Sequence, residues 1–109
     1  MASVDYSLNV KKYVPCPDAA AVRGIVQYLG IALRRPDSAI VATADPRERA
    51  RLRESFLKRR LKLALPDDEL DAAVTDVLHA MSTDRAKSRV TVCYLLADRF
   101  GKLPLFAHA

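Results

Sequence analysis

The chain has 109 residues, and its 18 Lys and Arg outnumber its 13 Asp and Glu, which gives a formal net charge of +5. The length matches the commonest size of a single domain, and a hydrophobic content of 50% argues against global disorder. With 3 Gly and no Trp, the composition favours an all-α fold with an Ala, Leu and Val core over a turn-rich β fold. The positive charge favours anionic partners, although a charge of this size is also ordinary for a small domain.

Hydrophobic spacing predicts one compact bundle of about five helices, a single domain over residues 1–109 with a short extended C-terminal tail. The predicted helices span residues 5–14, 17–34, 46–62, 67–81 and 84–100, and the tail spans residues 101–109. Pro15 and Pro17 separate the first two helices, because proline lacks a backbone donor and clashes with the preceding turn.

The second predicted helix contains two glycines, Gly24 and Gly30. Each weakens a helix by about 1 kcal/mol relative to Ala, so we expect them where the helix packs closely against another. The following residues, 36–44, have some strand character around Ile40 and Val41. Because no second run of this kind is evident, we interpret the segment as a connecting loop with these two side chains under the core.

The third predicted helix has a clear start and a high positive charge. Asp45 can cap its N-terminus, Pro46 suits its first turn, and Glu48 can complete a capping box. The basic residues of this helix are Arg47, Arg49, Arg51, Arg53, Lys58, Arg59, Arg60 and Lys62.

The last two predicted helices differ in character. The fourth begins with Asp67, Asp68 and Glu69, contains no Lys or Arg, and has apolar residues at helical spacing. The fifth is expected to start at a cap provided by Ser82, Thr83 or Asp84 and to end at Gly101. Its residues are apolar on nearly every side, which predicts a central position in the bundle.

Several segments together resemble a known family. They are ALRRPDS with ADP downstream, FLKRRL, and DRAKSRVTVCYLLADRFGK. These segments resemble a family of small bacterial proteins known only as domain of unknown function 2853. The resemblance extends from about Val10 to Phe106. The resemblance implies a compact helical protein of the bacterial cytosol, and it brings no catalytic residues.

The arginine-rich third helix is the strongest candidate for a functional surface. Arg49, Arg53 and Arg60 lie near one side of it, and arginine suits bidentate contact with phosphate. These residues could therefore contact an anion or a nucleic-acid backbone without sequence preference. The alternative is that the basic helix pairs with the acidic fourth helix, with each exposed ion pair contributing less than about 1 kcal/mol.

Two other segments are candidate sites. The polar residues Arg34, Arg35, Asp37 and Ser38 could form a ligand or partner site on a loop, or could serve only as turn and capping residues. In the tail, the apolar residues Leu103, Leu105 and Phe106 could form an interface with a second copy, or could dock on the body of the same chain. Docking on the same chain is the favoured alternative.

The sequence contains no recognisable catalytic or metal-binding constellation. Asp71, Thr75 and His79 share a face of the fourth helix, but a metal site needs about three or four ligands, so we expect no metal and no cofactor. Cys93 is expected to be a buried, inert thiol, and Cys16 lies between prolines without an evident base. We therefore expect no enzymatic activity.

The function predicted from the sequence is that of a non-catalytic protein-interaction or accessory domain with an unknown partner, and a homodimer is one assembly considered. Electrostatic binding of nucleic acid is the alternative, and an enzyme with an unrecognised site comes third. Two cysteines outside any CxxC motif, no evident secretion signal and no apolar run near about 18 residues predict a cytoplasmic protein without membrane association.

Overall fold

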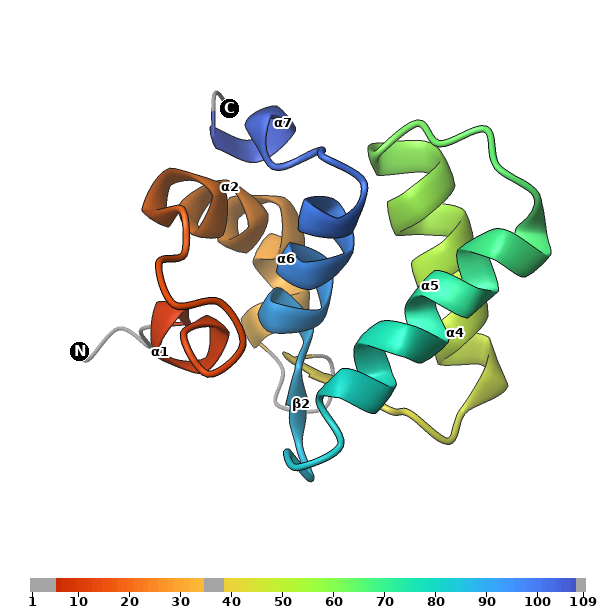
Figure 1. The fold of residues 1–109 in the computed structure, drawn as a ribbon, viewed down its shortest axis with the longest axis horizontal. Coiled ribbons are helices and arrows are strands. Elements are labelled where there is room, and N and C mark those ends of the chain that lie inside the picture. The colour runs from red at the N-terminus through yellow and green to blue at the C-terminus, as the bar shows by residue number, and fades with distance from the viewer. Residues whose placement is uncertain (1–5, 35–38, 108–109) are drawn as a thin grey trace.

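The structure of the chain is a computed structural model that describes residues 6–34 and 39–107 (Figure 1). The elements, in chain order, are α1 (Ser7–Val10), α2 (Ala19–Leu29), the 3₁₀-helix η1 (Gly30–Arg34), β1 (Ile40–Val41), α4 (Pro46–Arg51), the π-helix η2 (Leu52–Arg60), α5 (Asp67–Ala80), β2 (Lys87–Ser88), α6 (Arg89–Arg99) and α7 (Pro104–Ala107). The predicted mostly helical fold is thus confirmed. The radius of gyration, 12.9 Å, is that of a compact domain of this length.

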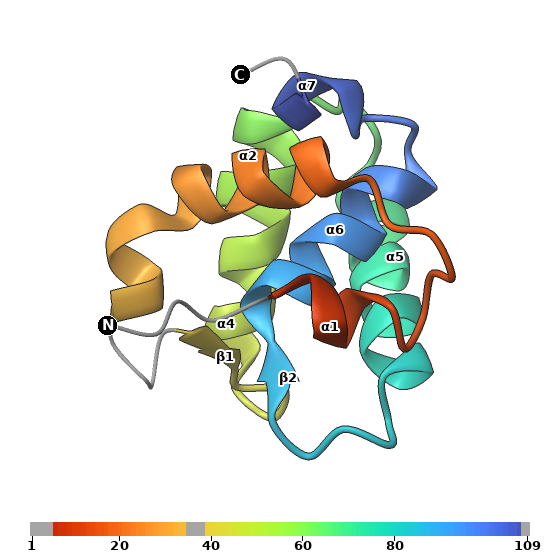
Figure 2. The ribbon, with the colours of Figure 1, turned by 90° about the vertical axis from the view of Figure 1, so that its left-hand side faces the viewer.

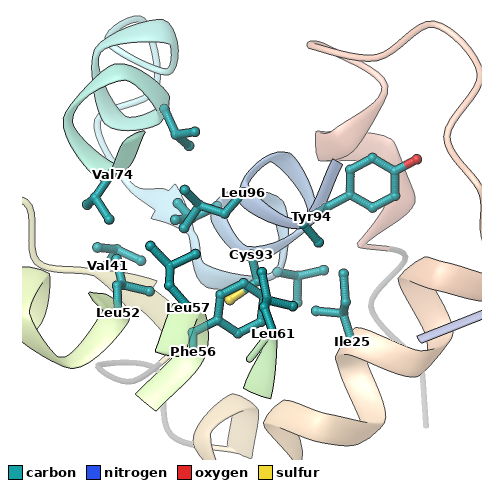
Figure 3. Packing of buried hydrophobic residues seen from close by; sticks show 14 of the residues in the cluster. Ile25, Val41, Leu52, Phe56, Leu57, Leu61, Val74, Cys93, Tyr94 and Leu96 are labelled. Carbon is teal, nitrogen blue, oxygen red and sulfur yellow. The ribbon is translucent and has the colours of Figure 1, made fainter. Parts of the chain in front are cut away.

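The central element is α6, as its apolar sequence predicts. Figures 1 and 2 show α2 on one side of it and the pair formed by α5 and α4–η2 on the other. Nearly every residue of α6 is buried, including Val90, Val92, Cys93 and Leu96. Figure 3 shows the Cys93 sulfur among the core side chains contributed by the surrounding helices. Burial on all sides explains why this helix has no polar face.

The fifth helix begins later than predicted, because its expected N-terminal part forms a strand. Lys87 and Ser88 make the antiparallel partner of Ile40 and Val41, so residues 40–41 are a short strand and not only a loop. The partner was missed because it is only two residues long and polar. Neither Ser82, Thr83 nor Asp84 caps α6, which starts at Arg89 after Ser88.

The first helix is also shorter than predicted, and a polar network holds it. The Asp84 carboxylate accepts hydrogen bonds from Lys12 Nζ and Tyr13 OH, both at 2.6 Å, and from Asn9 Nδ2 at 3.2 Å. Thr91 of α6 donates to the Asn9 side chain. Asp84 therefore fastens α1 to the loop before β2, instead of capping the fifth helix.

The third predicted helix changes its hydrogen bonding part-way. It is α-helical over α4 and continues as the π-helix η2, in which bonds join residues five apart. This pitch places residues four and five apart on one face, and Leu52, Phe56, Leu57 and Leu61 are all buried. The helix ends at Arg60, and Lys62 just beyond it has a left-handed φ of 57°. Leu63 N–H donates to the Leu57 carbonyl at 3.1 Å.

The predicted extended tail instead forms the short helix α7, packed on α2. Gly24 permits this contact, since a Cβ atom there would lie 2.2 Å from the Phe106 carbonyl oxygen. The expectation of close packing at Gly24 is confirmed. Gly30 does not share this role, because no atom lies near its Cβ position; it has a φ of 39° and ends α2. Glycine is favoured there because the backbone has a positive φ.

We predict that Gly24→Ala displaces α7 from α2. The added methyl group overlaps the Phe106 carbonyl, and overpacking of this kind costs about 1–3 kcal/mol of unfolding free energy. Urea unfolding would measure the loss, and faster hydrogen exchange at the Ala107 amide, which bonds to Leu103 in α7, would locate it. Gln27→Ala, an exposed change on the same helix, is the control and should be neutral. Unchanged exchange at Ala107 would contradict the proposed contact.

We also predict that Asp84 stabilises the fold only above acidic pH. The hydrogen bonds from Lys12, and then from Tyr13, lower the pKa of Asp84 from 3.8 to about 2. A carboxyl group whose pKa is lower in the folded state adds stability above its unfolded pKa and loses it as the pH falls through the folded pKa. Asp84→Asn should therefore cost about 2 kcal/mol at neutral pH. The difference from the wild type should shrink as the pH falls from 3.8 to about 2, measured by urea unfolding.

Candidate functional site

The face of α4–η2 that is directed toward α5 is paired internally. Arg53 Nη1 donates to both carboxylate oxygens of Asp71 at 3.0 Å, and Arg49 donates to Thr75 Oγ1 at 2.7 Å. Lys58 Nζ lies 2.8 Å from Glu54 and 2.5 Å from Asp67. These contacts are the basic-to-acidic helix pairing expected as the alternative to a phosphate-binding surface. They are exposed, so each contributes less than about 1 kcal/mol.

The three arginines expected to bind an anion do not form one surface. Arg49 and Arg53 line a shallow pocket of about 280 Å³ beside α5, where Asp71 already neutralises Arg53. Arg60 lies elsewhere: its guanidinium stacks 4.6 Å from the centroid of the Phe106 ring and 5.4 Å from that of Tyr28. It also donates to the Leu105 carbonyl at 3.4 Å. All three side chains therefore have partners within the chain.

The other predicted segments are only partly described. Arg34 is exposed at the end of η1, whereas Arg35, Asp37 and Ser38 lie outside the described residues. The polar loop site therefore stays a prediction.

In the C-terminal segment, Phe106 is buried, Leu103 is half-buried and Leu105 is 40% exposed. Phe106 stacks on Phe56 with ring centroids 6.0 Å apart, and Tyr28 meets its edge at 6.1 Å. The segment thus docks on its own chain, as favoured from the sequence.

A second pocket lies on the opposite side of α4–η2, between α2 and η2, and we name it the α2–η2 pocket. Its volume is about 170 Å³. Tyr28, Leu29, Leu52 and Phe56 supply its apolar walls. Its remaining lining residues are Arg51, Ser55, Arg89 and Cys93. The sequence did not reveal this pocket, because its walls come from segments far apart in the chain.

A buried ion pair lies at the α2–η2 pocket. Glu48 of α4 accepts a hydrogen bond from Arg89, the first residue of α6, and both residues are more than nine-tenths buried. Arg51 Nη1 lies 3.8 Å from the same Glu48 carboxylate. Two guanidinium groups therefore lie close to one carboxylate at this end of the pocket.

The capping role expected for Glu48 is not its main contact. Asp45 caps α4 by accepting from the Arg47 amide at 2.9 Å, while the Glu48 side chain turns inward to Arg89. One signal in the sequence could have indicated this. Glu48 lies four residues before Leu52, and residues four apart share a face of a helix, so Glu48 occupies the buried face. A charged residue there requires an oppositely charged partner.

The Cys93 thiol at the pocket is protonated. Its burial raises its pKa to about 12, so it carries no thiolate at neutral pH. The expectation that this thiol is buried is confirmed. Cys16 is free and exposed.

Within residues 6–34 and 39–107 there is no group of three or more His, Cys, Asp or Glu side chains arranged to hold a metal ion. Asp71 and Thr75, considered above as part of a metal site, instead accept hydrogen bonds from Arg53 and Arg49. The same part of the chain has no helix with the length and apolar character needed to cross a membrane.

Comparison with known protein families gives a match over most of the chain. Residues 5–104 fit the family described as "Protein of unknown function (DUF2853)". The chain belongs to this family. A search of curated proteins finds no matching sequence. Membership of DUF2853 confirms the resemblance seen in the sequence, and it assigns no ligand or activity, so function has to be argued from the pocket and its charges.

We predict that Glu48→Gln destabilises the protein by about 3 kcal/mol, because the buried Arg89 guanidinium loses its charged partner. Chemical denaturation at neutral pH would measure this loss. The matched control is Glu54→Gln, which removes an exposed carboxylate on the same long helix and should cost less than about 1 kcal/mol. Equal losses of unfolding free energy for the two changes would show that the buried Glu48–Arg89 pair stabilises the fold no more than an exposed ion pair does.

Proposed function

We propose that this protein is a non-catalytic interaction domain that binds a protein partner through the α2–η2 pocket. The observation that carries the proposal is the pocket itself, which has apolar walls and two arginines, Arg51 and Arg89, among its lining residues. Binding sites typically combine apolar walls with a few polar groups in this way. Ligand pockets for drug-sized molecules and cofactors have volumes of roughly 300–1,000 Å³. A pocket of about 170 Å³ suits a single side chain of a partner better than a cofactor.

The second candidate function is sequence-independent binding of nucleic acid. The internal contacts of Arg49, Arg53 and Arg60 count against the arginines first considered for it. The supporting observation is the exposure of other basic residues of the same helix, Arg47, Arg51 and Arg59. Arg47 and Arg51 have side chains that are 90% and 69% exposed. This candidate therefore rests on a different set of arginines.

The proposal places the protein in the cytoplasm and assigns it no enzymatic activity. Two free cysteines support a reducing compartment. The neutral Cys93 thiol, in a pocket without a neighbouring catalytic base, supports the absence of nucleophilic chemistry there.

A displayed random-peptide library selected on the immobilised protein tests the proposal. Ser55→Trp, which places an indole at the half-buried lining position Ser55, provides the pocket-blocked control. We expect enriched peptides that bind the wild type and lose affinity for Ser55→Trp, with circular dichroism showing that the variant is folded. Peptides that bind both proteins equally, or no enrichment, would overturn the proposal.

Fluorescence anisotropy with labelled DNA and RNA oligomers tests the second candidate. We expect no micromolar binding at moderate salt, because Arg49, Arg53 and Arg60 are engaged within the chain and are not available for phosphate. If binding is observed and falls steeply with salt, the triple variant of Arg47, Arg51 and Arg59 to Gln should abolish it. The matched triple variant of Arg49, Arg53 and Arg60 would distinguish the two sets. Such binding would favour the nucleic-acid function over the protein-interaction function.

A further inference from the structure

The size of the α2–η2 pocket limits what can enter it. An engineered apolar cavity of about 150 Å³ in another protein holds one benzene molecule. The pocket here has a volume of about 170 Å³, so one aromatic ring fills it and a two-ring group does not fit. Tyr28 and Phe56 form part of its walls. Aromatic walls favour an aromatic guest, because tilted and edge-to-face ring pairs add to the free energy of burial.

The walls are fixed before any guest binds. The Tyr28 and Phe56 rings lie 6.0 Å apart, and both contact Phe106 of α7. Tyr28 OH also lies 3.5 Å from the Ser55 carbonyl, to which it donates. Preformed walls reduce the entropy lost on binding, so even a single anchoring side chain can contribute usefully to affinity.

The charged side chains at the pocket indicate which kind of residue lies next to the aromatic side chain in a bound segment. Arg89 is engaged by Glu48 in the interior, while the Arg51 side chain is 69% exposed at the mouth. The 3.8 Å separation between Arg51 and Glu48 is too long for a hydrogen bond, so Arg51 keeps its donors for another acceptor. A carboxylate is the acceptor that the planar guanidinium fits best among protein side chains.

A further positive charge lies near one of the aromatic walls. The Arg60 guanidinium lies 5.4 Å from the centroid of the Tyr28 ring. Positive charge near a binding site attracts acidic peptide segments as they approach and repels basic ones. The geometry and the charge thus agree on an acidic partner.

We infer that the α2–η2 pocket recognises an aromatic side chain next to an acidic residue in a partner polypeptide, with the ring packed against Tyr28 and Phe56 and the carboxylate on Arg51. This inference rests on the proposed function, and it adds the chemistry of the bound segment. Arg51 is the residue that selects for acidic sequences, and the apolar walls select for the ring.

The test uses the peptides enriched in the selection described above, synthesised and titrated against the wild type, Arg51→Gln and Arg23→Gln. We expect the enriched peptides to contain Phe or Tyr next to Asp or Glu. Arg51→Gln should weaken their binding by about 10-fold, because a charge-assisted hydrogen bond is lost. Arg23 is an exposed arginine of α2 outside the pocket lining, so Arg23→Gln should leave affinity unchanged.

The outcomes separate this inference from the proposed function. Peptides that depend on the pocket, as judged by Ser55→Trp, but lack the aromatic–acidic pair would overturn the inference and leave the function intact. The same holds if Arg51→Gln and Arg23→Gln bind the peptides equally well. A failure to enrich any peptide that depends on the pocket would overturn both.

Discussion

The buried contact between Glu48 and Arg89 is the constraint on which much of the structure depends. It joins α4, at the start of the long basic helix, to the first residue of the central helix α6. A buried charge without a partner is costly, so each of these side chains fixes the position of the other's helix. Arg89 of this pair also lines the α2–η2 pocket, so the contact that orients the two helices also places a charged residue at the pocket.

The basic helix α4–η2 separates two kinds of surface. On the side directed toward α5, Arg49, Arg53 and Lys58 pair with residues of α5 and with Glu54. On the other side, the π-helical pitch buries Leu52 and Phe56, which form part of the apolar wall of the pocket. The basic residues on the side of the helix toward α5 therefore serve mainly to stabilise the fold. The candidate binding site lies on the other side of the helix.

The sequence predicted those features that depend on local spacing. The acidic start of α5, the N-cap at Asp45 and the apolar α6 follow from residues close together in the chain. Features made by distant residues were missed. The partner of β1 is only two residues long, and Asp84 forms hydrogen bonds with residues more than 70 positions away instead of capping the next helix. The pocket belongs to this second group, since α2, η2 and α6 meet there only after folding.

The packing of α7 has a consequence for communication within the molecule. Phe106 contacts the rings of Tyr28 and Phe56, which are also walls of the α2–η2 pocket, and Arg60 covers Phe106 from the other helix. The C-terminal helix and the pocket therefore share two side chains. Because coupling between two sites is reciprocal, a guest that binds more tightly when α7 is docked also strengthens the attachment of α7, and release of α7 weakens the binding of that guest.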